Sequence, residues 1–471
     1  MNNEVSVVIL AAGLGTRMKS RQAKVLHRAG GDSLVGHAVS TALAGARPER
    51  IFVVVGHQAE VVQQSLAPRG VGFIHQTEQK GTGHAVLCGR DQLQSNGGLL
   101  IILYGDCPLV RQETITGLIA THQRSTAACT LISTRLDDPT GYGRVIRDVH
   151  GNVQAIVEQK AATPEQHLVQ EINAGIYCFN ADLFWKHAGE IQPNNAANEY
   201  YLTDMVEILI RAGHSIQPYF IADSGELLGI NTRVELAAVD RIFRERTVHD
   251  LMLAGVTIER PETVTIDSSV KIGMDSIVEP FARILGRTTI GENCRIGACS
   301  IISNCRLADA VEILPFSHIV DSTLEQGAHA GPYARVRMQS HIEAGAVIGN
   351  FVELKKTRLG AKSKAQHLAY LGDSSIGAGV NIGAGTITCN YDGKKKSPTT
   401  IGDGAFVGSN STLVAPVVLG KGSYVAAGSV ITQEVPEDAL ALGRSRQAVK
   451  AGWAKHRREA QAAAGPVVSK K

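Results

Sequence analysis

Several features are missing from this 471-residue sequence, and each absence excludes a class of protein. No apolar run reaches 18 residues, so we expect no membrane-spanning helix. The opening residues MNNEVSVVIL contain no basic stretch, which argues against a secretory signal. The formal net charge is only +3, too small for a nucleic-acid-binding surface over the whole chain. We therefore expect neither a membrane nor a nucleic acid as a partner.

Cysteine is scarce and shows no pairing pattern. The eight cysteines run from Cys88 to Cys389 without a single C-x-x-C pair. A long chain that is not exported has no need of disulfides. We therefore expect reduced thiols in a cytoplasmic protein. Cys107 is a candidate reactive thiol, although nothing in the sequence indicates a lowered pKa.

Up to about residue 229 the sequence alternates between short apolar runs and helical patterns. The apolar runs are 5–10, 51–55, 99–103, 130–133 and 176–179, separated by amphipathic segments such as 34–44 and 114–122. Continuous Val, Ile and Leu runs between helices are typical of an α/β fold with a mostly parallel sheet. Ligands of such sheets bind at the carboxyl ends of the strands.

Residues 232–254 follow a different pattern. Apolar residues alternate there with Arg, Glu and Asp at helical spacing, and no Pro or Gly interrupts them. The segment is predicted to be one helix, which links a domain of residues 1–231 to the rest of the chain.

After this helix, aliphatic residues recur at a period of six. The first set is Ile266, Ile272, Val278, Ile284, Ile290, Ile296 and Ile302. The pattern fades near residues 307–339 and returns at Ile342, Ile348, Leu354, Ile376, Ile382, Ile401, Val407, Leu413, Leu419, Val425 and Ile431. Glycine often follows the aliphatic residue, where it relieves a tight corner. The repeat predicts a parallel β-helix of about nine coils within a domain of residues 255–449.

Residues 389–400, CNYDGKKKSPTT, interrupt the repeat with Asp-Gly, Ser-Pro and three lysines. We interpret them as a loop expelled from the β-helix, and residues 450–471 as a polar tail. The lysines are either a solvated loop tip or an attraction for anionic phosphates. Cys294, Cys299 and Cys305 are interpreted as small turn residues rather than a metal site, because residues stack between coils at a spacing of about 18.

A glycine-rich turn, LAAGLGTRM, follows the first apolar run directly. Gly13 and Gly15 would let backbone N–H groups approach a phosphate at the start of a helix. Arg17 and Lys24 add positive charge nearby. The same glycines also fit a plain tight turn, so this motif alone does not decide between the two.

Two later segments strengthen the prediction of a nucleotide site. Gln76, with the GTG stretch that begins at Gly81, could form a second backbone approach, around a base or sugar. Asp106 follows the 99–103 run, where a carboxylate can hold Mg²⁺ beside phosphates. A lone Asp at this place is otherwise a loop or cap residue.

Several motifs occur in one order along the chain. They are LAAGLGTRM, KVLH, Gln76 with GTGHA, YGD, DDPTGYGR, IVEQK, EINAGIY, NEYYLTD and GIN. With the hexapeptide repeats, they resemble the bacterial family of bifunctional N-acetylglucosamine-1-phosphate uridylyltransferase/glucosamine-1-phosphate N-acetyltransferases over nearly the whole chain. The resemblance implies a Rossmann-like nucleotidyltransferase domain and a left-handed β-helix acetyltransferase domain. It also implies that acetyl-CoA acetylates glucosamine-1-phosphate and that UTP then uridylylates the product. The result would be UDP-N-acetylglucosamine, a precursor of peptidoglycan and lipopolysaccharide.

The resemblance assigns residues of the uridylyltransferase site. It implies Mg²⁺ bound by Asp106 and Asn231, with Arg17 and Lys24 as catalytic partners of the phosphates. Contacts to UTP or to the sugar nucleotide are implied for Leu10, Ala11, Ala12, Gly13, Lys24, Gln76, Gly81, Thr82, Tyr104, Gly105, Asp106, Gly143, Glu158, Asn173 and Asn231. The sequence departs from the family at Leu14 and Ala23, which removes no group that the chemistry needs.

A second site is implied on the β-helix of what would be a homotrimer. His367 resembles the general base, and imidazole titrates near neutral pH as the deprotonation of an amine requires. The implied contacts to glucosamine-1-phosphate are Arg337, Lys355, Tyr370 and Asn381. Those to acetyl-CoA are Ala384, Asn390, Tyr391, Ser409, Ala427 and Arg444. Ser445 and Arg446 depart from the Val-Pro that is frequent in the family, at the end of the CoA groove.

Two other interpretations remain open at this stage. One is a nucleotidyltransferase whose β-helix only regulates or oligomerises, which would leave His367, Tyr370 and Asn390 without a use. The other is a sugar-nucleotide-binding scaffold, which would have no need of the pair Asp106 and Asn231.

Overall fold

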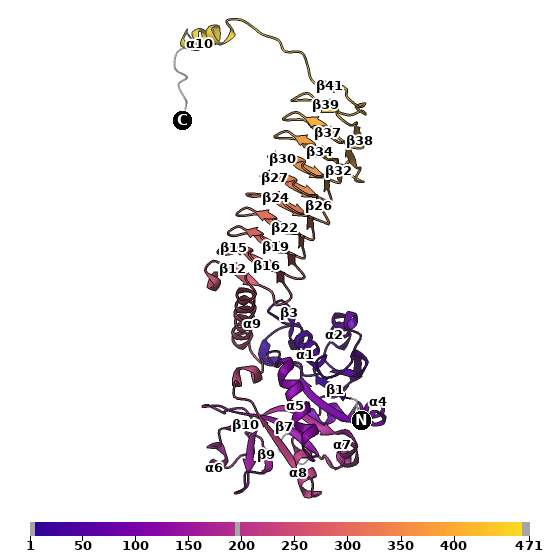
Figure 1. Ribbon diagram of the computed structural model, residues 1–471, viewed down its shortest axis with the longest axis vertical. Coiled ribbons are helices and arrows are strands. Elements are labelled where there is room, and N and C mark those ends of the chain that lie inside the picture. The colour runs from indigo at the N-terminus through magenta and orange to yellow at the C-terminus, as the bar shows by residue number, and fades with distance from the viewer. Residues whose placement is uncertain (1–4, 194–197, 464–471) are drawn as a thin grey trace. The chain divides into compact units, whose positions relative to one another are not determined.

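The computed structural model describes residues 5–193 and 198–463 and divides into two compact units. Unit 1 contains Met1–Asp250 and Ile266–Ser269, and unit 2 contains Leu251–Thr265 and Val270–Lys471. In Figure 1 the indigo to magenta part of the chain is an α/β domain, and the orange part is a solenoid of short strands. Among the described residues, no helix is both long enough and apolar enough to cross a bilayer.

Unit 1 is built on a sheet with the strand order β11-β7-β10-β6-β1-β4-β5, and β8 and β9 extend from β10. The strands are β1 (Val5–Leu10), β4 (Ile51–Val55), β5 (Gly72–His75), β6 (Leu99–Tyr104), β7 (Cys129–Arg135), β8 (Arg144–Arg147), β9 (Val153–Val157), β10 (Glu171–Asn180) and β11 (Ile216–Phe220). The pairs β1–β4, β1–β6, β4–β5 and β7–β11 are parallel, which confirms the prediction of a mostly parallel sheet. However, β10 runs antiparallel to both β6 and β7.

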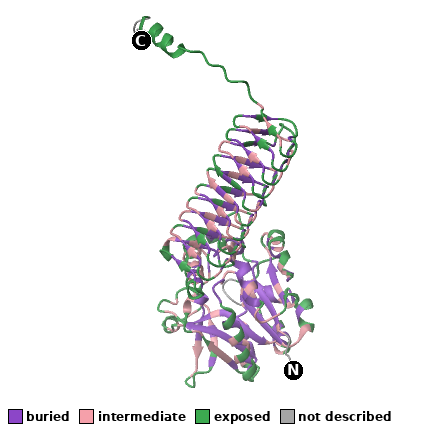
Figure 2. Cartoon of the chain, turned by 45° about the horizontal axis from the view of Figure 1, so that its top comes forward, coloured by how far each residue is buried: buried purple, intermediate pink, exposed green. Residues whose placement is uncertain are grey.

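Helices cover both faces of this sheet, so its central strands are buried on both sides (Figure 2). The helices are α1 (Leu34–Ala42), α2 (Ala59–Leu66), α3 (Thr82–Leu87), α4 (Arg90–Leu93), α5 (Gln112–Arg124), α6 (Pro164–His167), α7 (Ala181–His187) and α8 (Asp204–Arg211). Side chains alternate along β1, so Val7 and Ile9 share a core with α1 and α5. Val8 and Leu10 lie in the opposite core, with α7 and α8. This two-sided burial explains the uninterrupted apolar run.

The helix α9 (Arg233–Leu253) matches the predicted segment to within one residue at each end, but most of it belongs to unit 1. Val239 lies in an apolar cluster with Met18 and Leu34. The ring of Phe243 stacks on His37 with 4.1 Å between the ring centroids. The first turns of α9 are therefore a structural part of unit 1 and not only a connection.

Unit 2 is a left-handed parallel β-helix whose strands, two to four residues long, run from β12 (Thr257–Ile258) to β41 (Leu440–Ala441). The strands form three sheets of 11, 10 and 9 strands, in which each strand pairs with the strand one coil away. The repeating aliphatic residues point into the prism, where Ile284 and Leu354 are fully buried. Each such side chain contributes about 1.5–3 kcal/mol to folding.

The β-helix continues without a gap through residues 307–339, where the strict six-residue pattern fades in the sequence. The buried aliphatic residues there are Leu307, Ile313, Ile319, Leu324 and Val336. The interval between buried aliphatic residues shortens from six residues to five between Ile302 and Leu307. Thr289 therefore pairs with Arg306, whereas a coil of three six-residue units would pair it with Leu307. A coil can close with one residue fewer, and a strict six-residue template then loses its phase.

The interruption near residue 390 is an expelled loop, as predicted. The strands β34 (Ile387–Cys389) and β35 (Thr399–Ile401) resume the coil on either side of it. Within the loop, Asp392 accepts hydrogen bonds from the backbone N–H groups of Lys394 and Lys395. Beyond β41, the polar tail forms α10 (Trp453–Ala463), which buries none of its residues, and residues 464–471 lie outside the described part.

The cysteines of the β-helix have the small structural role that the sequence predicted. All eight cysteines of the chain are free thiols. The Cys294 thiol donates to the backbone oxygen of Ala308, and the Cys305 thiol donates to that of Ser303, each at 3.1 Å. In the described ranges, no group of three or more His, Cys, Asp or Glu side chains is arranged to hold a metal ion.

Candidate active sites

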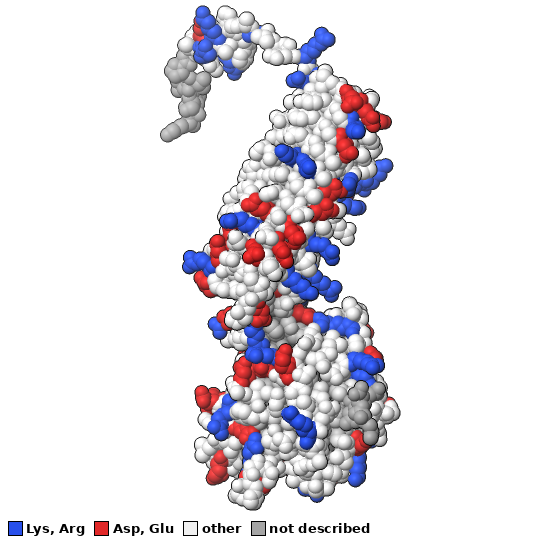
Figure 3. Space-filling model, in the orientation of Figure 1, with Lys and Arg blue, Asp and Glu red and all other residues white. Residues whose placement is uncertain are grey.

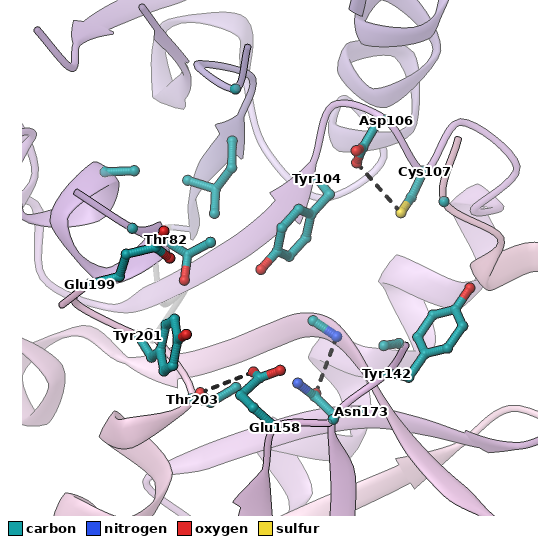
Figure 4. A pocket seen from close by; sticks show the side chains of 18 of the residues that line it. Thr82, Tyr104, Asp106, Cys107, Tyr142, Glu158, Asn173, Glu199, Tyr201 and Thr203 are labelled. Carbon is teal, nitrogen blue, oxygen red and sulfur yellow. Dashed lines mark hydrogen bonds between the residues drawn. The ribbon is translucent and has the colours of Figure 1, made fainter. Parts of the chain in front are cut away.

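Unit 1 contains a cavity of about 610 Å³ at the carboxyl ends of β1 and β6 (Figure 4). Most of the residues predicted for the nucleotide site line it: Leu10, Ala11, Ala12, Gly13, Lys24, Gln76, Gly81, Thr82, Tyr104, Asp106, Gly143, Glu158 and Asn173. Gly105 supports the wall from behind, with its N–H donating to the Leu10 oxygen at 2.9 Å. Strand ends are where α/β sheets bind ligands, so this cavity is the candidate site.

Two glycines shape the loop after β1. A side chain at Gly13 would meet no atom within 4 Å, so the backbone there faces open space. Gly15 has a φ of +61°, and a Cβ on it would lie 2.6 Å from the Cβ of Lys24. Gly15 therefore permits the turn that brings Lys24 beside the loop, while Gly13 leaves the backbone open to an anion.

A cluster of four polar side chains lies beside this loop. The Lys24 ammonium forms an ion pair with Asp106 Oδ2 and donates to Asn231 Oδ1 at 3.3 Å. Arg17 Nη2 donates to the same Asn231 oxygen at 2.8 Å. Asn231 is itself held by Glu235, whose carboxylate accepts its backbone N–H at 2.5 Å. The oxygens of Asp106 and Asn231 thus face one cationic group, which is the arrangement that a bound metal ion would need.

The opposite side of the cavity is built from β9, β10 and the segment before α8. Glu158 accepts a hydrogen bond from Thr203 Oγ1 at 3.3 Å, and burial raises the pKa of its carboxyl group. Asn173 donates to the Tyr177 hydroxyl at 2.6 Å and accepts the Gly175 N–H at 3.1 Å, which fixes its amide. Carboxyl and amide groups held in this way can hydrogen-bond to the hydroxyls of a sugar.

The second candidate site lies on the β-helix at His367, the last residue of β30 (Lys364–His367). Asn350 is its register partner on β27 (Val347–Asn350), and the Asn350 amide oxygen lies 2.8 Å from His367 Nδ1. Because that oxygen can only accept, Nδ1 carries the proton and Nε2 keeps its lone pair. The imidazole is exposed, so Nε2 can act as a base toward a bound substrate.

Three residues predicted to bind the sugar phosphate lie on consecutive strands of one sheet. Arg337 ends β25 (Arg335–Arg337), Lys355 ends β28 (Glu353–Lys355), and Tyr370 begins β31 (Tyr370–Gly372). Arg337 and Lys355 are register partners. Figure 3 shows basic and acidic side chains interspersed over the face in view.

Other predicted residues are distributed along the neighbouring sheet and corner. Asn381, on β33 (Asn381–Ile382), lies one strand beyond β30. Ala384, Ser409 and Ala427 occupy successive turns of one corner, where the Asn410 N–H donates to the Ala384 oxygen at 2.7 Å and the Gly428 N–H donates to the Ser409 oxygen at 2.8 Å. A Cβ on Gly428 would lie 4.0 Å from Arg444 Cδ, which places Arg444 beside this corner. Asn390 and Tyr391 begin the expelled loop.

Comparison with known proteins finds two kinds of transferase domain along the chain. A MobA-like NTP transferase domain model matches residues 7–168, a bacterial transferase hexapeptide model matches 269–304, and a hexapeptide repeat of succinyl-transferase matches 398–433. The bifunctional protein GlmU of Solibacter usitatus is 64% identical over 459 residues, which cover 98% of each chain. GlmU of Koribacter versatilis is 49% identical over 464 residues, again 98% of each chain, and GlmU of Trichlorobacter lovleyi is 45% identical over 456 residues.

The chain belongs to the GlmU family. It is a bifunctional transferase with a nucleotidyltransferase domain followed by a hexapeptide acyltransferase domain. It acetylates glucosamine-1-phosphate from acetyl-CoA and transfers a uridylyl group from UTP to N-acetylglucosamine-1-phosphate, releasing pyrophosphate. The product is UDP-N-acetylglucosamine, a precursor of peptidoglycan and lipopolysaccharide.

The cavity of this GlmU family member also contains residues that the sequence analysis did not single out. Among them are Gln79, Tyr142, Lys160, Glu199, Tyr201 and Thr203. Three of the motifs contain them, since DDPTGYGR includes Tyr142, IVEQK includes Lys160, and NEYYLTD includes Glu199, Tyr201 and Thr203. Gln79 lies between Gln76 and the GTGHA motif. The ordered motifs therefore indicated which segments form the cavity, but not which side chains of those segments line it.

Cys107 lies in the cavity wall of the GlmU site, but its thiol is not suited to be a nucleophile. Burial raises the pKa of Cys107 well above its usual value, and the neighbouring Asp106 carboxylate adds to the shift. Thiolates, not thiols, are the reactive form. The raised pKa of Cys107 therefore favours its neutral thiol form.

Proposed function

We propose that the cavity of unit 1 is where UTP and N-acetylglucosamine-1-phosphate react. The observation that carries this assignment is that Lys24 contacts Asp106 and Asn231 together, beside the open backbone at Gly13. A phosphate oxygen of the sugar attacks the α-phosphorus of UTP, and pyrophosphate leaves from the opposite side. Both reactants are anions, so Arg17 and Lys24 lower their repulsion and hold them in line.

We assign the two walls of the cavity to the two substrates. Leu10, Ala11, Ala12 and Gly13 would contact the nucleotide, together with Gln76, Gly81 and Thr82. Tyr104, Gly143, Glu158 and Asn173 would contact the sugar, and Figure 4 shows the Tyr104 ring extending toward the side that carries Glu158. A carboxyl group whose pKa is raised by burial keeps more of its protonated form, which can donate as well as accept hydrogen bonds.

Asp106 and Asn231 are the residues that would hold Mg²⁺. Their side-chain oxygens approach the same ammonium group of Lys24, which stands in the place that a cation would take. Mg²⁺ is usually bound through one or two protein oxygens, with phosphate oxygens and waters as its other ligands. A bound ion would neutralise charge on the phosphates, and Lys24 would then be released toward them.

We infer that the β-helix site transfers the acetyl group directly. The His367 Nε2 lone pair would take a proton from the amine of glucosamine-1-phosphate as the amine nitrogen attacks the thioester carbon. A C–N bond forms, the C–S bond breaks, and CoA leaves as a thiolate. Arg337, Lys355, Tyr370 and Asn381 would hold the sugar phosphate. Acetyl-CoA would run along Ala384, Asn390, Tyr391, Ser409, Ala427 and Arg444.

Because the cysteine thiols are free and the co-substrates UTP and acetyl-CoA are cytoplasmic metabolites, we place the enzyme in the cytoplasm.

The division between the two chemistries can be tested with fragments. A fragment of residues 1–231 removes Val239 and Phe243, which cover Met18 and Leu34, whereas a fragment of residues 1–269 keeps all of unit 1. We expect the longer fragment to catalyse uridylyl transfer near the full-chain rate and to lack acetyl transfer. The shorter fragment should unfold at lower temperature, because each lost apolar side chain removes about 1.5–3 kcal/mol. A longer fragment that is folded but inactive in uridylyl transfer would refute this division.

We also propose that the enzyme is a homotrimer. Phe316, Tyr333 and Phe351 form a stacked column on one corner of the β-helix, with successive ring centroids 5.1 Å apart. These rings and Leu368 are between 47% and 62% exposed, a large apolar surface for an isolated chain. Leu368 directly follows His367, so a neighbouring copy that covered this column would lie beside the acetyl site.

The assembly prediction is tested by light scattering on the purified enzyme. We expect a trimer for the wild type, and dissociation for Tyr333→Glu, because a charge would be placed in the centre of the apolar column. Acetyl transfer should fall with dissociation, while uridylyl transfer should persist. A wild-type monomer with full acetyl-transfer activity would contradict the proposal.

A further inference from the structure

The carboxylate of Asp373 connects three segments of the acetyl site. Its Oδ2 accepts a hydrogen bond from Lys355 Nζ at 2.6 Å and another from the side-chain amide of Asn390. Its backbone is also engaged: its N–H donates to the Lys355 oxygen at 2.9 Å, and its own oxygen accepts the Thr399 N–H at 3.2 Å. Asp373 therefore contacts the end of β28 and both ends of the expelled loop.

Positive charge is concentrated around this carboxylate. Lys355 is buried. The ammonium of Lys396, on the expelled loop, lies near that of Lys355, and the guanidinium of Arg337, on the preceding coil, lies near Lys396. Glu353 accepts the Arg337 Nε–H at 2.8 Å, so each of the two phosphate-binding cations has its own carboxylate partner. A buried ammonium group without a partner is unfavourable, so the position of Lys355 depends on Asp373.

The ionisation of the pair is consistent with this dependence. Burial, the largest single influence, would lower the pKa of Lys355, but the hydrogen bond to Asp373 and the charge of that carboxylate, together with the neighbouring Lys396 and Tyr370, raise it. Burial would likewise raise the pKa of Asp373, but hydrogen bonds from Lys355 and Asn390 lower it. The other titratable groups facing Lys355 are the Lys396 ammonium of the expelled loop and the Tyr370 hydroxyl, and the proximity of Lys355 lowers the pKa of Lys396. Both members of the pair are therefore charged at neutral pH.

We propose that Asp373 is a positioning residue for acetyl transfer, which aims the Lys355 ammonium at the sugar phosphate and, through Asn390, fastens the expelled loop beside it. The inference rests on the proposed assignment of Lys355 and Asn390 to the acetyl site. A lysine side chain is long and flexible, and an ammonium group has three N–H donors. One donor is used by Asp373, which fixes the direction of the group and leaves the other two for a phosphate.

The test is the steady-state kinetics of Asp373→Asn, a change that keeps the shape of the side chain and removes its charge. We expect KM for glucosamine-1-phosphate to rise about 10- to 100-fold, the range for losing a hydrogen bond between charged groups, with a smaller change in kcat. The alkaline limb of the pH profile of 1/KM should move to lower pH, because Lys355 loses the anion that keeps it protonated. Uridylyl transfer by the same preparation should be unchanged.

Two variants serve as controls. Glu353→Gln removes the carboxylate partner of Arg337, so it should raise KM without moving the alkaline limb, because a guanidinium group does not lose its proton in this range. Asp373→Glu keeps the charge and should restore the alkaline limb even if KM is only partly recovered. If Asp373 serves only the stability of the fold, the alkaline limb should not distinguish these two variants from Asp373→Asn.

Three outcomes separate the possibilities. If Asp373→Asn lowers the melting temperature or kcat but leaves both KM and the alkaline limb as in the wild type, Asp373 is only structural and the inference is overturned. An Asp373→Asn variant with wild-type kinetics overturns it as well. If Lys355→Ala itself leaves KM for glucosamine-1-phosphate unchanged, the proposed sugar-phosphate site is wrong, whatever the result at Asp373.

Discussion

Replacing His367 by alanine is expected to slow acetyl transfer by about 10²–10⁴-fold, the usual contribution of a general base, while uridylyl transfer continues. The amine of glucosamine-1-phosphate must lose a proton to become acylated, and His367 offers an exposed Nε2 lone pair for it. Asn350 fixes the tautomer by accepting the Nδ1–H at 2.8 Å. The acidic limb of the acetyl-transfer pH profile should flatten in the variant, because the general base is gone.

The matched control for this variant is His329→Ala. His329 lies on β24 (His329–Ala330) of the same sheet and pairs with Glu312 at 2.8 Å, away from the proposed sugar-phosphate residues. It should leave both activities within a few-fold of the wild type. An Asn350→Ala variant should lose less than His367→Ala, because the base remains and only its orientation is released. A His367→Ala enzyme with near-wild-type acetyl transfer and an unchanged pH profile would remove this residue from the mechanism.

Much of the fold could be predicted because buried positions recur at regular intervals along the sequence. Ile266 to Ile302 keep a constant phase because each coil there has three units of equal length. At Leu307 the coil closes with one residue fewer, so the spacing of the apolar residues changes although the interior of the β-helix is continuous. The direction of β10 was equally hidden, because an apolar run is the same whether its strand is parallel or antiparallel to its neighbours.

The candidate sites could be predicted only to the extent that their residues sit in ordered motifs. Asp106 and Asn231 are 125 positions apart, and no spacing rule would join them without the family resemblance. Asp373 lies in no such motif, and its role depends on contacts with Lys355 and Asn390 that only the coiling of the chain creates. Side chains that position other side chains are therefore the part of a site that sequence patterns reveal least.

Replacing Asp106 by asparagine is expected to lower uridylyl transfer by about 10²–10³-fold or more, which is the effect of removing a group that stabilises transition-state charge. The substitution keeps the size of the side chain but removes the negative charge that would bind Mg²⁺. It also removes the partner of the Lys24 ammonium, which would then no longer be held between Asp106 and Asn231. Raising the Mg²⁺ concentration should recover part of the activity, because the weakened step is metal binding.

Acetyl transfer by the Asp106→Asn enzyme should stay within a few-fold of the wild type, because no residue of the proposed β-helix site lies in unit 1. The charge-matched control is Asp182→Asn on α7, an exposed carboxylate that should affect neither reaction. Both rates should be measured on one preparation, over a range of Mg²⁺ concentrations. Equal loss of both activities would indicate misfolding or one shared site. A full uridylyl-transfer rate with an unchanged Mg²⁺ requirement would exclude Asp106 as a metal ligand, and Asn231 would then lack the negatively charged partner that a divalent cation needs.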